Sequence, residues 1–313
     1  MHRASVERCC VAMKPLAACR VICRAGGCIR GLRTPRADGS DRRAMSRRAP
    51  SYIVLLALLS IGHGSAWAAT AEELTARVAL LNQTERYWRD RSARLTLTLF
   101  DKSGAEQKRE LELYQKRYAD NKQRSIVFFR APATLKDVGI LEYQQFGQVT
   151  EQWLYQPTVR RARRITSKMD ESLMGTDFTT HDFDLLAGLP AQAFADNRVV
   201  LQGEARADGV EVFVLEYSMA HHASYKRASL WLGKSDLATR RLELYDHANR
   251  AVKRIVATDV RMMGRIPVAF RIEGETLGAN TRTVMNLEKI EFDQGLEDDL
   301  FTEGALERGG RWK

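Results

Sequence analysis

The feature of this sequence that most limits its fold is a succession of short segments in which apolar and polar residues alternate. Arg94–Leu99 reads Arg-Leu-Thr-Leu-Thr-Leu, which places the leucines on one face of a β-strand and the polar groups on the other. A turn at Asp101–Gly104 leads into a return strand at Lys108–Tyr118. Because the gaps between such segments are mostly of hairpin length, the pattern favours antiparallel pairing. Eleven further strands are expected at Arg124–Phe129, Ile140–Gln144, Gln152–Tyr155, Arg160–Ile165, Val199–Glu204, Val210–Tyr217, Ala228–Leu232, Arg241–Tyr245, Val252–Val260, Val268–Glu273 and Thr281–Phe292.

Two short helices are expected beside these strands. Thr70 and Glu73 have the spacing of a capping box, so a helix should begin at Ala71 and extend to Arg89. A second helix is expected from about Thr180 to Ala187, before Gly188. A sheet of about eleven strands tends to curl. We therefore expect a mainly β (α+β) fold, in which a curled antiparallel sheet forms an incomplete, half-open β-barrel. Short helices should cover its concave face and leave an apolar hollow.

Residues 45–68 have the layout of a secretory signal peptide. Arg47 and Arg48 precede an uncharged apolar run at Tyr52–Ile61, and Ala66-Trp67-Ala68 supplies a small-residue cleavage site. The run is about half of the ~20 residues that cross a bilayer as a helix. We expect cleavage near Ala68 and release into the periplasm; an uncleaved N-terminal anchor is the alternative.

Most of the charge imbalance lies before this cleavage site. Residues 1–68 hold 12 of the 49 basic and 3 of the 39 acidic side chains, which leaves 37 basic and 36 acidic side chains in the rest. The net charge of +10 therefore gives no support to nucleic-acid binding. All five cysteines also precede residue 29, so the remaining chain has no disulfide or thiolate chemistry.

The chain is interpreted as three segments. Residues 1–44 are expected to be a start-site artefact or a disordered leader, with Met45 as the true start, although a functional cysteine-rich extension is an alternative. Residues 45–68 are the expected signal peptide. Residues 69–313 contain no linker rich in proline, glycine or serine and are expected to form a single domain.

A group of motifs in the predicted domain resembles the signature of the outer-membrane lipoprotein-sorting-like family, which is periplasmic and related in fold to LolA and LolB. The central part is a Trp-Leu-Tyr strand, then an arginine-rich strand, then a Met-Gly-Thr-Asp-Phe loop. The resemblance runs from about Ala71 to Leu306. The matching segments are Val127–Pro132, Lys136–Gly139, Gln152–Pro157, Arg160–Ile165, Ser172–Phe178 and Leu300–Thr302.

The resemblance implies a carrier that holds acyl chains of a lipid or lipoprotein in an apolar cavity and passes them toward the outer membrane. It also implies an inner-membrane transporter of the resistance-nodulation-division (RND) type as partner. Burial of methylene groups at ~0.8 kcal/mol each is sufficient for such binding, without directed polar contacts. The alternative is that the candidate cavity residues fill an ordinary core. These candidates are Leu97, Leu99, Leu111, Leu113, Phe128, Trp153, Leu230, Leu232 and Leu242.

Two polar segments are further candidates. The arginine-rich strand is expected to place Arg161 and Arg163 on one face and Arg160 and Arg164 on the other, for contact with a headgroup or a membrane partner. A solvated strand that pairs with Glu142 and Glu151 is the alternative. The loop with Met174, Gly175, Asp177 and Phe178 is expected to be a lid hinge, with Asp177 as helix N-cap; a simple turn at the start of the helix is equally consistent.

Neither a metal, a cofactor nor catalysis is expected. His181, Asp182 and Asp184 lie close together and His221 is adjacent to His222, but zinc needs three or four convergent ligands. The sequence contains no recognised nucleophile or nucleotide-binding motif. Two other functions stay open: a regulatory lipid-sensing module of the RseB type, and a lipid hydrolase.

Overall fold

The computed structural model describes residues 69–119, 121–145, 150–165, 172–186, 198–219 and 224–309. These residues belong to one compact unit, Gly64–Lys313. The expected leader and signal peptide lie outside the described residues, as do His221 and His222. Among the residues described, no helix is both long and apolar enough to cross a bilayer.

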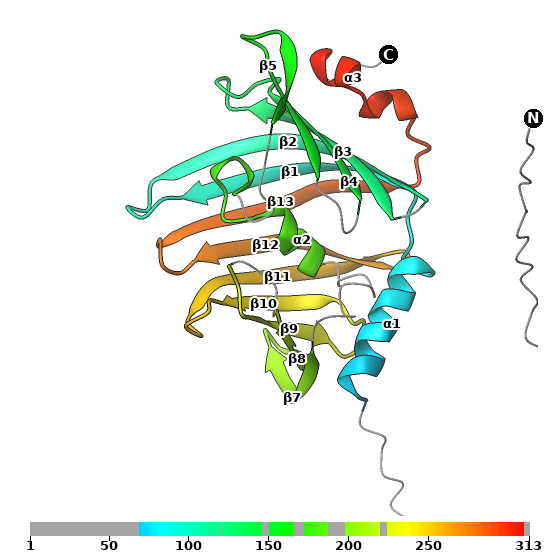
Figure 1. Cartoon of the computed structure of the whole chain (residues 1–313), viewed down its shortest axis with the longest axis vertical. Helices are drawn as coiled ribbons and strands as arrows, with labels where there is room; N and C mark the ends of the chain where they lie inside the picture. The colour runs from blue at the N-terminus through cyan, green and yellow to red at the C-terminus, as the bar shows by residue number, and fades with distance from the viewer. Residues whose placement is uncertain are drawn as a thin grey trace, which may run out of the picture. The chain divides into compact units, whose positions relative to one another are not determined.

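The described residues form one antiparallel sheet of thirteen strands, and the expected fold class is confirmed (Figure 1). The strand order is β6-β5-β4-β3-β2-β1-β13-β12-β11-β10-β9-β8-β7, so β6 and β7 are free edges and the curled sheet does not close. Each strand overlaps one of the thirteen segments expected from the sequence, so only the estimate of about eleven strands for the sheet was too low. The bounds are β1 Asp90–Phe100, β2 Glu106–Tyr118, β3 Lys122–Ala131, β4 Gly139–Gln145, β5 Glu151–Gln156, β6 Arg161–Ile165, β7 Val199–Ala207, β8 Val210–Ser218, β9 Arg227–Gly233, β10 Thr239–Tyr245, β11 Ala251–Met263, β12 Ile266–Thr276 and β13 Thr281–Phe292.

The helices are short. The described residues contain three α-helices, α1 (Ala71–Gln83), α2 (Thr180–Leu186) and α3 (Glu303–Glu307), and two 3-10 turns, η1 (Leu173–Gly175) and η3 (Asp298–Phe301). The expected capping box at the start of α1 is present. α1 ends six residues earlier than expected, before Thr84, where the backbone leaves helical geometry (φ −121°, ψ −91°). The Thr84 hydroxyl donates there to the Leu80 carbonyl oxygen (2.7 Å).

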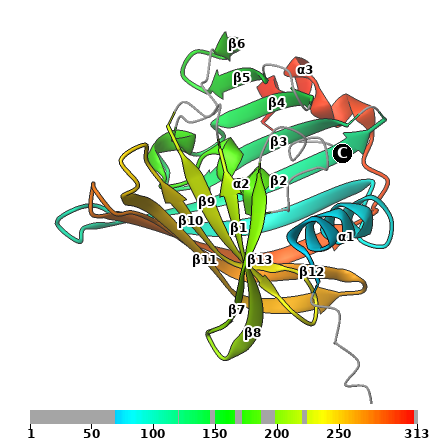
Figure 2. The same ribbon diagram turned by 60° about the horizontal axis from the view of Figure 1, so that its bottom comes forward.

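The two faces of the sheet carry different helices (Figure 2). We call the face that packs against α1 and α2 the inner face. Leu74 and Val78 of α1 and Leu185 of α2 share a core there with strands β8–β11. On the opposite, outer face, η3 and α3 cover strands β3–β6 through Phe301 and Leu306. Because side chains alternate along a strand, neighbouring residues of one strand belong to different cores.

Candidate functional site

The inner face of β1–β5, β12 and β13 is lined by aliphatic and aromatic side chains. Cross-strand pairing places Leu113, Val127, Ile140 and Leu154 in one row over four adjacent strands, and all four remain partly exposed. A contiguous apolar surface that is not fully covered marks a binding site more often than ordinary core. We call this region the inner apolar surface; its members are Leu97, Leu99, Leu111, Leu113, Val127, Ile140, Leu154, Phe270 and Leu287.

The other half of the inner face is filled by the protein itself. Leu230, Leu232 and Leu242 pack in the same core as α1 and α2. The cavity that Leu185 of α2 forms with Tyr217, Ala228, Leu230 and Leu242 has a volume of about 10 Å³, close to the space of one water molecule. In this conformation, these three candidate residues therefore form core, and Leu97, Leu99, Leu111 and Leu113 belong to the inner apolar surface.

Phe128 and Trp153 do not line the inner face, which corrects the sequence-based assignment. Phe128 is fully buried on the outer face, opposite Gly139. A Cβ atom on Gly139 would lie 2.7 Å from Leu306 Cδ1, which shows how closely α3 approaches the sheet there. Trp153 packs against Tyr143 with ring centroids 4.9 Å apart in the same outer core. The alternation along β3 and β5 turns both rings away from Val127 and Leu154.

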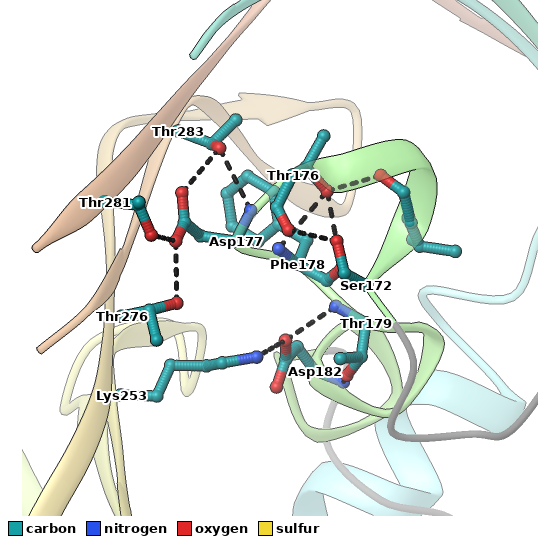
Figure 3. Close-up of polar contacts among 11 residues, drawn as sticks. Ser172, Thr176, Asp177, Phe178, Thr179, Asp182, Lys253, Thr276, Thr281 and Thr283 are labelled. Carbon is teal, nitrogen blue, oxygen red and sulfur yellow. Dashed lines mark hydrogen bonds and ion pairs between the residues drawn. The ribbon is translucent and has the colours of Figure 1, made fainter. Parts of the chain in front are cut away.

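The segment before α2 is held to the sheet by Asp177 (Figure 3). One carboxylate oxygen, Oδ1, accepts hydrogen bonds from the hydroxyls of Thr276 (2.6 Å) and Thr281 (2.5 Å), and Oδ2 accepts from Thr283 (2.8 Å). Asp177 is therefore not the N-cap of α2, as the sequence had indicated. Its side chain instead ties the loop to the hairpin of β12 and β13.

Thr179 takes the capping role. Its hydroxyl accepts from the backbone N–H of Asp182 (3.2 Å), while its own backbone N–H donates to Asp182 Oδ2 (2.8 Å). Asp182 is fully buried and forms an ion pair with Lys253 Nζ on β11 at 2.8 Å (Figure 3). The other oxygen, Oδ1, has no hydrogen-bond partner among the described residues. A buried ion pair thus joins α2 to the inner face.

The predicted hinge residues have the backbone geometry of a tight turn. Met174 and Gly175 both have positive φ, 51° and 75°. Phe178 is almost fully buried and packs so closely on Gly274 that a Cβ atom there would lie 2.7 Å from Phe178 Cε1. The loop is thus fixed at Asp177 and Phe178 and turns sharply at Met174.

A polar pocket of about 510 Å³ borders this loop. Its lining includes Leu99, Gln107, Arg109 and Asp177. Arg109 is buried, and its guanidinium donates to the Met174 carbonyl oxygen and to Gln107 Oε1, both at 2.6 Å. Burial lowers the pKa of Arg109 below its ordinary value.

The four arginines of the predicted contact strand are all exposed. Arg160 lies in the turn before β6 with φ of 54°, so the assignment of this residue to the strand was wrong. Arg161 and Arg163 lie on the inner-face side of β6, at the free edge. Arg164 lies on the outer side, where it pairs with Glu151. For Arg164, this geometry matches the solvated-strand alternative.

Comparison with protein families matches the larger part of the described chain. A family model whose description reads "Uncharacterized protein" covers residues 121–308, more than half of the chain. The chain belongs to this family. The match contains strands β3–β13 and the Asp177 loop. A comparison with curated proteins finds no match.

Solved structures share the fold. A DUF1329 family protein from Desulfovibrio piger has a TM-score of 0.66 at 22% identity, over 75% of this chain and 97% of that one. A domain assigned to the outer membrane lipoprotein-sorting proteins, from Vibrio parahaemolyticus, has a TM-score of 0.66 at 20% identity, over 76% and 98%. A LolA superfamily protein from Nitrosomonas europaea has a TM-score of 0.55 at 18% identity, over 76% and 100%. The chain therefore has the open, curled LolA-type fold.

Sequence reasoning did not find several polar residues of this site. Thr276, Thr281 and Thr283 lie about a hundred positions from Asp177 and meet it only through the pairing of β12 with β13. Alternating threonines at 281 and 283 were the one available signal. Arg109 and Lys253 gave none, since each lies beside another basic residue in its strand and no local pattern marks which of the two is buried.

Proposed function

We propose that this LolA-like protein binds the acyl chain of a lipid or lipoprotein on its inner apolar surface and carries it toward the outer membrane. The observation that supports the proposal is the row of Leu113, Val127, Ile140 and Leu154, which is apolar, contiguous and partly exposed on the face that the helices border. Covering such side chains with methylene groups releases ~0.8 kcal/mol per group, so a long chain would be held without polar contacts. The proposed function is ligand binding, and no residue is assigned a catalytic role.

The site of action in this proposal is the periplasm. The expected signal peptide at 45–68 and the lipoprotein-sorting assignment of the related Vibrio domain support it. A transporter of the RND type in the inner membrane is proposed as the donor or partner, on the strength of the motif resemblance.

The loop 172–179 and α2 form the lid in this proposal. They are held by specific polar contacts, Asp177 with three threonines and Asp182 with Lys253, whereas the apolar cavity beneath α2 has room for only one water. A ligand that displaces α2 would open the surface formed by Leu230 and Leu242. The positive-φ pair Met174 and Gly175 would be the point at which the chain turns.

Displacement of a neutral naphthylamine fluorophore tests the binding proposal. Protein expressed from the full chain and purified from the envelope is titrated with the fluorophore, then with a long-chain acyl ligand. We expect fluorescence enhancement on binding and its loss on acyl competition. A protein that neither enhances the fluorescence nor yields lipid on organic extraction would contradict the proposal.

A further inference from the structure

Two arginines lie against the ring of one buried tryptophan at the start of β1. The guanidinium carbon of Arg91 lies 4.5 Å from the centroid of Trp88, and that of Arg117 lies 3.9 Å from it. Trp88 is 4% exposed and packs against Phe292, with ring centroids 6.4 Å apart. Contact with a ring face leaves the edge of a guanidinium, with its N–H donors, available for other partners.

These two positive charges have no carboxylate partner in the described part of the chain. The Nε atom of Arg91 donates to Gln115 Oε1 at 2.6 Å, and the guanidinium of Arg117 contacts the rings of Trp88 and Tyr87. Cross-strand pairing continues from Gln115 through Ser125 to Glu142, which is the first carboxylate in that direction. The Oε1 atom of Glu142 accepts a hydrogen bond from Gln152 at 2.7 Å. The two guanidinium charges therefore repel one another, and no carboxylate of the described residues offsets that repulsion.

The electrostatics of the pair indicate the missing charge. Burial, with a smaller effect of the Arg117 charge, lowers the pKa of Arg91 to about 9. Burial also lowers the pKa of Arg117, to about 10. In each case the charged form is disfavoured in the folded protein, and an anion placed between the two groups would reverse that effect.

The arginine pair borders the inner apolar surface. Arg91 lies two residues before Ala93 and four before Leu95 on the same side of β1, and Arg117 lies four residues after Leu113 on the same side of β2. A chain that lies along Leu113 and Leu111 would therefore have one end at the guanidinium groups.

We propose that Arg91 and Arg117 bind the anionic end, a carboxylate or phosphate, of the acyl ligand whose chain covers the inner apolar surface. This inference rests on the proposed function and adds the polarity of the ligand and its direction on the sheet. Paired guanidinium groups suit both anions, since their N–H donors can bind two oxygens at once.

The pocket at the opposite end of β1 and β2 fits an anion less well. The Arg109 guanidinium there already donates to Met174 and Gln107, and three carboxylates, Asp101, Glu106 and Asp177, line the same pocket. An anionic group in it would meet more negative than positive charge. The geometry therefore favours the Trp88 end of the strands.

The test compares two ligands that differ only in charge, hexadecanoic acid and its methyl ester, above neutral pH where the acid is ionised. Each competes with the neutral fluorophore on wild-type protein and on the variants Arg91→Gln and Arg117→Gln. Arg124→Gln is the matched control, because Arg124 also stacks on aromatic rings, Tyr143 at 4.5 Å and Tyr118 at 5.0 Å, but on the outer face.

We expect the wild type to prefer the acid over the ester by about tenfold or more, the usual effect of a charge-assisted hydrogen bond. Each of the two variants should lose most of that preference and keep its affinity for the ester, and Arg124→Gln should match the wild type. Inorganic phosphate alone should leave the affinity for the acid unchanged.

Three results would overturn the inference while the proposed function stands. They are equal binding of acid and ester by the wild type, equal weakening of both ligands in Arg91→Gln, and strong competition by inorganic phosphate, which would indicate a site for free anions. Binding of neither ligand would overturn the inference and the proposed function together.

Discussion

Asp177 and Thr283 are joined by two hydrogen bonds that run in opposite directions. The backbone N–H of Asp177 donates to Thr283 Oγ1 at 3.0 Å, and the Thr283 hydroxyl donates to Asp177 Oδ2 at 2.8 Å. Both residues are buried, so neither bond competes directly with water. The loop before α2 is thereby fixed to the central part of the sheet.

Removing this carboxylate should loosen the lid. Asp177→Ala eliminates the acceptor of three threonine hydroxyls and leaves the fully buried hydroxyl of Thr283 without it, which we expect to cost about 1–3 kcal/mol in the free energy of unfolding. Release of a bound acyl probe, followed by stopped-flow fluorescence, should become faster. Asp259→Ala is the control, because Asp259 is exposed and pairs with Arg261 at the surface. Unchanged release from Asp177→Ala would argue against a lid role.

Substitutions on the two faces of the sheet should separate binding from stability. Leu113→Asn removes the equivalent of about two methylene contacts from the inner apolar surface, and we expect the affinity for an acyl probe to fall by about tenfold. Its cost in the free energy of unfolding should be about 1 kcal/mol, because Leu113 is only partly buried.

Ile126 provides the matched outer-face variant. It is fully buried in the core with Leu306, so Ile126→Ala should cost about 2–5 kcal/mol in the free energy of unfolding. The folded fraction should bind the probe normally. Titrations and urea unfolding curves of both variants give the comparison, and a shared loss of affinity would show that the two faces are not functionally distinct.

The buried ion pair of Lys253 and Asp182 predicts strong coupling between α2 and β11. Lys253→Met leaves a fully buried carboxylate without its cation, which should cost about 3–5 kcal/mol in the free energy of unfolding. The double variant Lys253→Met, Asp182→Leu should recover most of this loss. About 1 kcal/mol should remain lost, because Asp182→Leu also removes the capping hydrogen bond from the Thr179 backbone N–H. A double-mutant cycle from denaturant unfolding measures the coupling. Purely additive effects would contradict it.

The C-terminal segment should contribute a pH-dependent stability. Hydrogen bonds from Lys116 first and Tyr118 second lower the pKa of Asp298 below its ordinary value. A lowered carboxyl pKa stabilises the fold above the unfolded-state value, and the gain is lost as the pH falls below about 4. The wild type should thus exceed Asp298→Asn in stability at neutral pH and converge with it in acid. We expect a small difference because Asp298 is exposed, with the neighbouring Asp299→Asn as control.

Strand positions were predictable because they depend on local alternation. Arg94–Leu99 and Thr281–Phe292 both lie within strands at the expected places. The face of the sheet on which each side chain lies was harder to predict, since a single strand can have buried side chains on both faces. Phe128 and Val127 are both apolar, and their roles are separated by the packing of η3 and α3 on the outer face, which covers Phe128 and not Val127.

The polar contacts of the site could not be predicted, because they depend on which distant strands become neighbours. Trp88 was expected in the helix, but the early end of α1 places it in the connection to β1, where Arg91 and Arg117 flank it. The family motif led to Asp177, and local spacing then favoured a helix cap over the threonines of β12 and β13. Tertiary pairing overrode that local preference.

Native mass spectrometry of the protein purified from its own envelope, with identification of any bound lipid, tests the central claim most directly. We predict a bound species with a long acyl chain on the wild type and on Ile126→Ala, and a clearly lower occupancy on Leu113→Asn. A wild-type protein without lipid, or a Leu113→Asn variant that retains the lipid fully, would contradict binding on the inner apolar surface.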